Sequence, residues 1–491
     1  MNEINPYKYI TTEHANNLPT VRIHRISIKN LKNTQNGVIE FACSKSFIPY
    51  DTQSDILGIY GQNGSGKTTM IQALRIIKDL LSGKAVDPNY SKLITIGENK
   101  ASIEVVFDFQ YPDEQIRSVV YSFDLTKEKN PSYVENQNYI NDGNILNTPK
   151  YYLRILNEKV QASGLIDGKE TRLQAFITYN LETGYGPTNK LPLLFASQKN
   201  DVMNKLAVIG NIAFKESKSS IFNTDLFGLL SEKTECSDYF LILQELMLFA
   251  TYYLFVVDSF GNGFIRLNFA LPVYTEKGAI FINPDYPTLY PKDYFEAAKK
   301  DIESVSLVLS TIIPDMELII HNPIETKDKN GKDAISFELY SKRGDIEMPI
   351  GYEADGVRKI IMFLKLITSA FNQKSTTIAI DELDAGVFEY LLGEILELFQ
   401  EHGKGQFIFT SHNLRPLEVL DKKFICFTTA NPSNRYIRMK GVGHSNNLRS
   451  LYFRNIIMAD KQDEVLYKNE KKYKILGAFK HCLASCEETD G

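Results

Sequence analysis

The sequence predicts an α/β fold in which a mostly parallel sheet is split by a long inserted lobe. Apolar runs rich in β-branched and aromatic residues at 55–60, 376–380 and 405–410 are typical of buried parallel strands. A glycine-rich loop joins the first run to an amphipathic helix predicted at 69–81. Because the other two runs lie far downstream, we expect the residues between them to form a second lobe.

Length and composition agree with several domains in one chain. The chain has 491 residues, of which 43% are hydrophobic and 23% charged, as in ordinary globular proteins with a sizeable core. We expect four segments: one half of a split head at 1–110, an insertion at 111–300, the other half of the head at 301–456, and a helical tail at 457–491.

The insertion changes character along its length. Three strand-like runs separated by Asn, Gly and Pro turns are followed by helical patterns from residue 200 onward. The strand-like runs are 117–125, 150–156 and 173–180, and the helices are predicted at 237–253 and 292–313. The apolar run 241–257 contains Gln244, Glu245 and several aromatics, so we interpret it as a buried helix. Sustained heptads are absent, which excludes a long coiled coil.

The loop after the first strand has the pattern G-x-x-x-x-G-K-[ST] at every fixed position. Glycines allow backbone N–H groups to turn toward phosphates, and the following helix directs its positive end at them. Lys67 is expected near the β- and γ-phosphates, and the Thr68 hydroxyl is expected on Mg²⁺. The nucleotide-binding residues predicted here are Gly61, Gln62, Asn63, Gly64, Ser65, Gly66, Lys67, Thr68 and Thr69.

Two carboxylates follow the strand at 376–380. At this position the first acid, Asp381, is expected to hold Mg²⁺, usually through water, and Glu382 is expected to orient or deprotonate the attacking water. The third buried strand leads to His412. Ligands of parallel sheets bind at the carboxyl ends of strands, which predicts that this histidine reaches the γ-phosphate.

A helix predicted at 360–371 opens at Gly356, just before the strand that ends in Asp381. Its first turn presents free N–H groups, which suit an anion brought by another subunit.

With these motifs in order, the chain resembles the ABC-type ATPases of the SMC, RecF and OLD (overcoming lysogenization defect) group, particularly compact bacterial ATPases related to OLD proteins. The matching segments are Gly61–Thr68 as Walker A, Ala354–Val357 as a degenerate signature motif, Ile378–Glu382 as Walker B, Asp384 as the D-loop and His412 as the switch histidine. The stretch 21–31, ending at 38–41, is similar to the antiparallel N-terminal hairpin of those heads. Ala354 departs from the pattern, because a serine usually stands there.

The resemblance implies an ATPase that uses ATP and Mg²⁺, with each nucleotide enclosed between two copies of the head. It implies Glu382, His412 and Lys67 as catalytic residues. Nucleotide contacts would come from Ala354, Asp355, Gly356 and Asp384, and metal contacts from Thr68, Asp381 and Gln110. Gln110 is the candidate for the Q-loop, and the alternative interpretation is an ordinary surface glutamine.

Other classes fit less well. A G-protein would need an Asn-Lys-x-Asp motif, which is absent, and AAA+ machines usually place their two Walker motifs closer together. The long insertion and the degenerate signature disfavour a transporter subunit. We find no secretory signal and no apolar stretch long enough to cross a membrane, and the five scattered cysteines are consistent with a reducing cytoplasm.

A net charge of −5 provides no global field for nucleic acid, so any such binding would be local. The basic candidates are 468–474 and the group Arg435, Arg438 and Lys440, and the alternative is a solvated surface. His481, Cys482 and Cys486 are candidate metal ligands, with a reduced tail as the alternative.

For the biological role, the family resemblance favours the sensor or scaffold subunit of a bacterial antiphage defence system. It would work with a separately encoded effector, most simply a nuclease, because no nuclease motif is found in this chain. The alternative is a RecF-like repair ATPase that acts directly on DNA.

Overall fold

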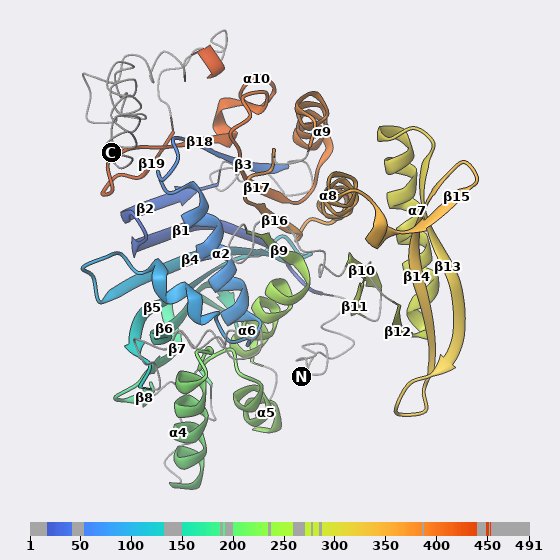
Figure 1. The fold of residues 1–491 in the computed structure, drawn as a ribbon. Helices are drawn as coiled ribbons and strands as arrows, with labels where there is room; N and C mark the ends of the chain where they lie inside the picture. The colour runs from blue at the N-terminus through green and yellow to red at the C-terminus, as the bar shows by residue number, and fades with distance from the viewer. Residues whose placement is uncertain are drawn as a thin grey trace, which may run out of the picture.

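The computed structural model describes most of the chain (Figure 1). The described residues are 17–41, 54–131, 150–186, 190–191, 200–233, 237–258, 271–275, 278–283, 287–384, 387–438, 448–450 and 452. The predicted tail at 457–491, with its basic run and its His/Cys group, lies outside them. Within the described part, no helix combines the length and the apolar character needed to cross a membrane.

A six-stranded, mostly parallel sheet confirms the predicted fold class. Its order is β19-β18-β3-β17-β16-β9, and all neighbours except the pair β18 and β19 are parallel. The strands are β3 (Asp55–Tyr60), β9 (Leu254–Val257), β16 (Thr377–Ile380), β17 (Gln406–Thr410), β18 (Ile425–Thr428) and β19 (Tyr436–Ile437). Strands β3, β9, β16, β17 and β18 are buried along their whole length, as their apolar, β-branched and aromatic content requires.

The second large sheet is antiparallel, with the order β2-β1-β4-β5-β6-β7-β8. Its strands are β1 (Thr20–Leu31), β2 (Thr34–Glu40), β4 (Lys100–Gln110), β5 (Ile116–Lys129), β6 (Tyr151–Ile166), β7 (Lys169–Asn180) and β8 (Gly184–Tyr185). The hairpin of β1 and β2 is the predicted N-terminal hairpin. Strand β4 pairs along its whole length with residues 116–126 of β5, so the expected boundary after residue 110 does not mark a break in this sheet. The strand-like runs expected in the insertion extend the N-terminal sheet instead.

Helix α2 (Lys67–Leu81) lies against both sheets. One apolar core contains side chains of α2 together with residues of β1, β4 and β5 on one side and of β3 and β17 on the other. Met70, Leu74 and Ile77 are fully buried in it. This packing fixes the start of α2 relative to the ends of the parallel strands. A second core lies on the other face of the parallel sheet, under α8 (Asp355–Asn372) and α9 (Glu389–His402).

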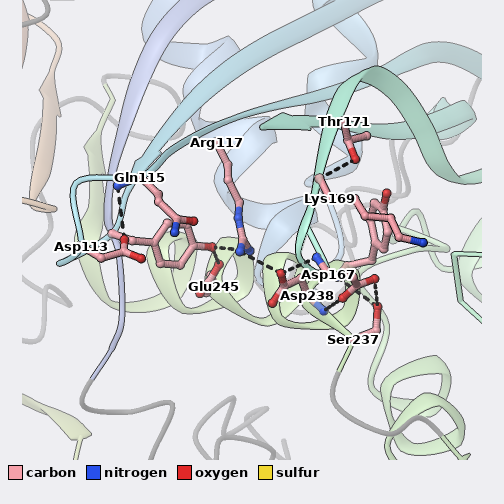
Figure 2. A network of polar contacts seen from close by, with 11 residues as sticks. Asp113, Gln115, Arg117, Asp167, Lys169, Thr171, Ser237, Asp238 and Glu245 are labelled. Atoms are coloured by element: carbon pink, nitrogen blue, oxygen red, sulfur yellow. Dashed lines mark hydrogen bonds and ion pairs between the residues drawn. The ribbon is translucent and has the colours of Figure 1, made fainter. Parts of the chain in front are cut away.

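Helix α6 (Asp238–Leu248) is fastened to the antiparallel sheet by a polar network (Figure 2). Arg117 donates to Asp238 Oδ2 at 2.8 Å and to the hydroxyl of Tyr111 at 3.2 Å, and that hydroxyl donates to Glu245 Oε2 at 2.8 Å. The helix then continues through a π-helical turn, η4 (Phe249–Tyr253), directly into β9. The prediction of a single helix over the apolar run 241–257 is therefore wrong for its last four residues, which form the edge strand beside β16.

A separate group of elements lies at one side of the molecule, beyond α8 (Figure 1). Helix α7 (Phe295–Ile312) packs against a small antiparallel sheet, and its position agrees with the helix predicted at 292–313. That sheet has β12 (Thr288–Pro291), β13 (Met316–Lys327), β14 (Asp333–Arg343) and β15 (Ile346–Pro349). The other elements are α4 (Asn200–Lys215), α5 (Thr224–Lys233), α10 (Pro416–Val419), the pair β10 (Leu271–Thr275) and β11 (Gly278–Ile282), and the short helical turns η3 (Pro88–Leu93), η5 (Lys292–Tyr294), η6 (Ile350–Tyr352) and η7 (Lys422–Phe424).

Candidate nucleotide-binding site

The glycine loop after β3 turns sharply into α2. Gly64 and Gly66 have φ values of 75° and 99°, in the left-handed region that favours glycine, and Gly66 is the N-cap of α2. A Cβ on Gly61 would lie only 1.8 Å from Thr428 Oγ1, so no side chain fits there. The loop therefore depends on its glycines for both conformation and space.

Lys67 lies over this loop. Its ammonium group donates to the carbonyl oxygens of Gly61 at 2.8 Å and Gln62 at 3.1 Å. Burial lowers the pKa of Lys67, and the carboxylates of Asp381 and Glu382 act in the opposite direction. The lysine thus places its charge at the mouth of the loop, facing two acids.

The two distant motifs meet at Asp381. Thr68 Oγ1, on the first turn of α2, donates to Asp381 Oδ1 at 3.2 Å. Asp381 follows the last residue of β16, and its backbone N–H donates to Val257 O at the end of β9 at 2.9 Å. A hydroxyl and a carboxylate at this separation are hard oxygen ligands of the kind that Mg²⁺ prefers.

One cavity of about 510 Å³ collects the predicted residues. It is lined by Lys32, Asn33, Asn63, Gly64, Gly66, Lys67, Thr68, Thr69, Asp381, Glu382, Asp384, Thr410 and His412. His412 follows β17, and its backbone N–H donates to Asp384 Oδ1 at 3.1 Å. Glu382 has a φ of 51°, which is a strained conformation for a residue other than glycine. The cavity therefore places two lysines, three threonines, three acids and a histidine around one space.

Three predicted nucleotide-binding residues support the loop rather than line the cavity. Gly61 and Gln62 accept from Lys67, and Ser65 Oγ donates to Gln62 O at 2.5 Å. Ser65 also contacts the Thr428 hydroxyl, which connects the loop to β18. The segment of β18 and β19 thus packs behind the glycine loop.

Gln110 does not join this cavity. It is the last residue of β4 and pairs with Thr20 and Ile116 in the antiparallel sheet. Strand β9 lies beside β16, and the polar residue that follows β9 is Asp258. Its carboxylate accepts from the Tyr90 hydroxyl at 2.7 Å and lies 3.9 Å from Arg75 Nε. The structure therefore separates Gln110 from the cavity in which Thr68 and Asp381 meet.

The signature-like segment also lies outside the cavity. Ala354 is the N-cap of α8 and makes no side-chain cap hydrogen bond. The side chain of Asp355 is 91% exposed, and a Cβ on Gly356 would meet no atom within 4 Å. The first turn of α8 is thus open to the surroundings.

Sequence reasoning missed Lys32 and Asn33, which form the turn between β1 and β2. Asn33 Nδ2 donates to the carbonyl of Gly64, and Lys32 lines the cavity. Burial lowers the pKa of Lys32, while the carboxylates of Asp381 and Asp258 act in the opposite direction. A polar turn with a lysine is visible in the sequence, but no local signal indicates that it meets the glycine loop.

The donor set fits Mg²⁺ bound together with phosphates and water. Among the described residues, no group of three His, Cys, Asp or Glu side chains is placed to hold a metal ion. Mg²⁺ at nucleotide sites usually takes one or two protein oxygens and completes its shell with phosphates and water. Thr68 and Asp381 are the residues that would supply those oxygens.

Comparison with known proteins gives a family for most of the chain. Residues 22–415 match the family model described as an AAA ATPase domain. No curated protein matches the chain. Among solved structures, the chain is similar to an SMC head bound to the C-winged helix domain of ScpA, at 13% identity and a TM-score of 0.39, with 85% of this chain and 97% of that chain covered. The chain is also similar to the SMC head domain from Thermotoga maritima, at 13% identity and a TM-score of 0.33, with 85% of this chain and 99% of that chain covered. Its similarity to the recombination mediator protein RecF with ATP has 13% identity and a TM-score of 0.35, with 86% of this chain and 100% of that chain covered.

Proposed function

The chain belongs to the AAA ATPase domain family, and from this premise we propose that it binds ATP with Mg²⁺ and hydrolyses it at the cavity where α2 meets the end of β16. The contact of 3.2 Å between Thr68 Oγ1 and Asp381 Oδ1 carries the proposal, because it joins motifs 313 positions apart. Both residues line a cavity that also contains Lys67 and Glu382. These are the side chains that phosphoryl transfer to water requires.

Each residue has a role that follows from its place. The N–H groups of the glycine loop and the Lys67 ammonium bind the β- and γ-phosphates. Thr68 and Asp381 supply oxygens to Mg²⁺, which neutralises phosphate charge when bound. Glu382 accepts a proton from the attacking water or orients it, and His412 contacts the γ-phosphate from the end of β17.

A second copy of the chain would complete the site. The open first turn of α8, with Ala354, Asp355 and Gly356, offers N–H groups to a triphosphate held by another head. Asp384 lines the cavity beside His412 and would lie near this contact. Alanine at 354 provides no hydroxyl, so in this arrangement the contact depends on backbone donors. ATP then favours association of two heads, and hydrolysis releases them.

The test uses Glu382→Gln, which keeps the shape of the side chain and removes the base. Size-exclusion chromatography with light scattering should give a larger mass for this variant with Mg²⁺ and ATP than without nucleotide. Lys67→Ala should show no such increase, because it lacks the phosphate-binding cation. An unchanged mass for Glu382→Gln, measured while it binds ATP, would argue against the paired heads.

For the biological role, we propose a cytoplasmic sensor or scaffold ATPase in bacterial antiphage defence, with a separately encoded effector such as a nuclease. The support is the resemblance of the ordered motifs to OLD-related ATPases and the lack of a nuclease motif in the sequence. Co-purification with the product of a neighbouring nuclease or toxin gene, in amounts that change with ATP, is the expected result. ATP-stimulated binding of gapped duplex DNA by the chain alone would instead favour a RecF-like repair ATPase.

A further inference from the structure

Thr410 occupies the junction between the two acids of the site. It is the last residue of β17, is 1% exposed and lines the cavity. Its hydroxyl donates to Asp381 Oδ1 at 2.6 Å and accepts from the backbone N–H of Glu382 at 2.8 Å. Its carbonyl accepts from the N–H of Leu383 at 2.9 Å. One residue thus contacts three consecutive residues of the turn after β16.

This turn needs such support because it lies beyond the regular pairing of β16 with β17. The pairing of β16 with β17 ends at Ile380 and Phe409. Two residues after Ile380, Glu382 adopts a φ of 51°. Backbone strain of this kind persists only where surrounding contacts enforce it. The Thr410 hydroxyl provides one of those contacts at the residue that bears the strain.

The same hydroxyl also fixes the metal side of the site. Thr68 and Thr410 both donate to Asp381 Oδ1. If Thr68 used its oxygen to hold Mg²⁺, the hydrogen bond from Thr410 would still orient the carboxylate. A neutral donor suits this task, because it leaves the negative charge of Asp381 available to the metal.

We propose that Thr410 is a positioning residue that sets the Asp381 carboxylate for Mg²⁺ and the Glu382 backbone for activation of water. This inference rests on the proposed ATPase function. It links the two acids to β17, the strand that His412 follows two residues later. A change at the end of β17 would therefore reach the metal oxygen, the base and the histidine together.

The test compares Thr410→Val, which removes the hydroxyl with little change in shape, with Thr410→Ser, which keeps it. In the full chain, Thr410→Val should lower kcat about tenfold or more and raise the Mg²⁺ concentration for half-maximal rate severalfold, with KM for ATP changed by less than about twofold. Thr410→Ser should restore most of the rate. The control is Thr377→Val on β16, which removes a buried hydroxyl bonded to Gln406 Oε1 at 3.1 Å away from the cavity. It should alter thermal stability without changing the Mg²⁺ dependence.

The outcomes separate the two proposals. If the wild-type chain hydrolyses ATP and Thr410→Val matches it in kcat and Mg²⁺ dependence, the role of Thr410 is overturned while the ATPase function stands. Equal effects of Thr410→Val and Thr377→Val on both quantities would likewise overturn it, since they would indicate a general loss of packing. If the wild-type chain with Mg²⁺ does not hydrolyse ATP, the proposed function fails and this inference fails with it.

Discussion

Two lysines face the cavity, from different parts of the chain. Lys67 follows the glycine loop, and Lys32 lies in the turn between β1 and β2. Burial lowers the pKa of both, because each ammonium loses part of its hydration in the cavity wall. A partly desolvated cation interacts more strongly with an anion than one in water does. Lys32 is therefore expected to add to phosphate binding.

The substitution Lys32→Met tests how much the positive charge of Lys32 contributes to phosphate binding. The methionine keeps the apolar stem and removes the ammonium, so KM for ATP should rise about tenfold, with a smaller effect on kcat. Steady-state kinetics and calorimetric titration with ATP measure the two effects. Lys29→Met is the matched control, because Lys29 is an exposed residue of β1 outside the cavity. Equal changes in the two variants would show that Lys32 acts only through the net charge of the chain.

At the scale of elements, the sequence predicts those parts of the site whose signals are local. Strand β3, the glycine loop and α2 are contiguous, and the motif together with its apolar flanks identifies them. Strand β9 escapes sequence reasoning because its four residues continue the apolar run of α6 and η4. A run of this kind has no periodicity that separates a buried helix from a buried strand.

The pairing between distant segments is also beyond local reasoning. Nothing in the residues around Lys32 indicates contact with the loop at Gly64, and nothing around Thr410 indicates a bond to Asp381. Strands β5 to β7 are visible as strand-like runs, but the sheet to which a strand belongs depends on its partners, so their assignment to the insertion does not match the observed pairing. Gln110 is a polar residue at a strand end, and its strand β4 belongs to the other sheet.

The junction of α2 with β9 predicts a pH dependence of stability. Lys78 Nζ donates to Leu254 O at 2.6 Å, and burial lowers the pKa of Lys78 from 10.5 to about 7. Between these values the unfolded chain binds a proton that the folded chain does not, so stability rises with pH in that window and is lowest below it. The slope should not exceed about 1.4 kcal/mol per pH unit.

Chemical denaturation at pH values between about 7 and 9 measures this slope, because one titrating group changes the free energy of unfolding steadily across such a window. Lys78→Met should flatten it, since the residue no longer titrates. Lys92→Met, at an exposed site in η3, should leave it as in the wild type. A slope that survives in Lys78→Met would assign the effect to another group.

At the scale of the whole molecule, the open turn of α8 lies outside the cavity and beside a separate group of elements. We propose that the two large sheets with α2, α8 and α9 form the head and that α7 with β12 to β15 forms an appended lobe. This lobe is joined to the head by Lys365 of α8, which donates to Asp301 of α7 at 2.5 Å. Glu353, next to the open turn, accepts from Ser341 and Arg343 of β14. If two heads pair as proposed, movement of the lobe would act on the turn of α8 that is offered to the second copy.

Mixing two inactive variants tests whether each site needs two copies. Lys67→Ala disables a cavity, whereas Gly356→Glu places a negative charge on the turn offered to the other cavity. The glutamate has space in its own chain and is tolerated at a helix N-terminus, so the fold should persist. In a mixed pair, one site carries both changes and the other carries neither. Because about half of the pairs in an equal mixture are mixed, and each of these has one intact site of two, the mixture should recover about a quarter of the wild-type ATPase rate.

Lys67→Ala mixed with Glu382→Gln is the control. Both of these changes lie in the cavity and neither lies in the turn of α8, so every site of a mixed pair stays damaged. If the first mixture stays as inactive as this control while each variant binds its partner, the open turn of α8 does not complete the neighbouring site.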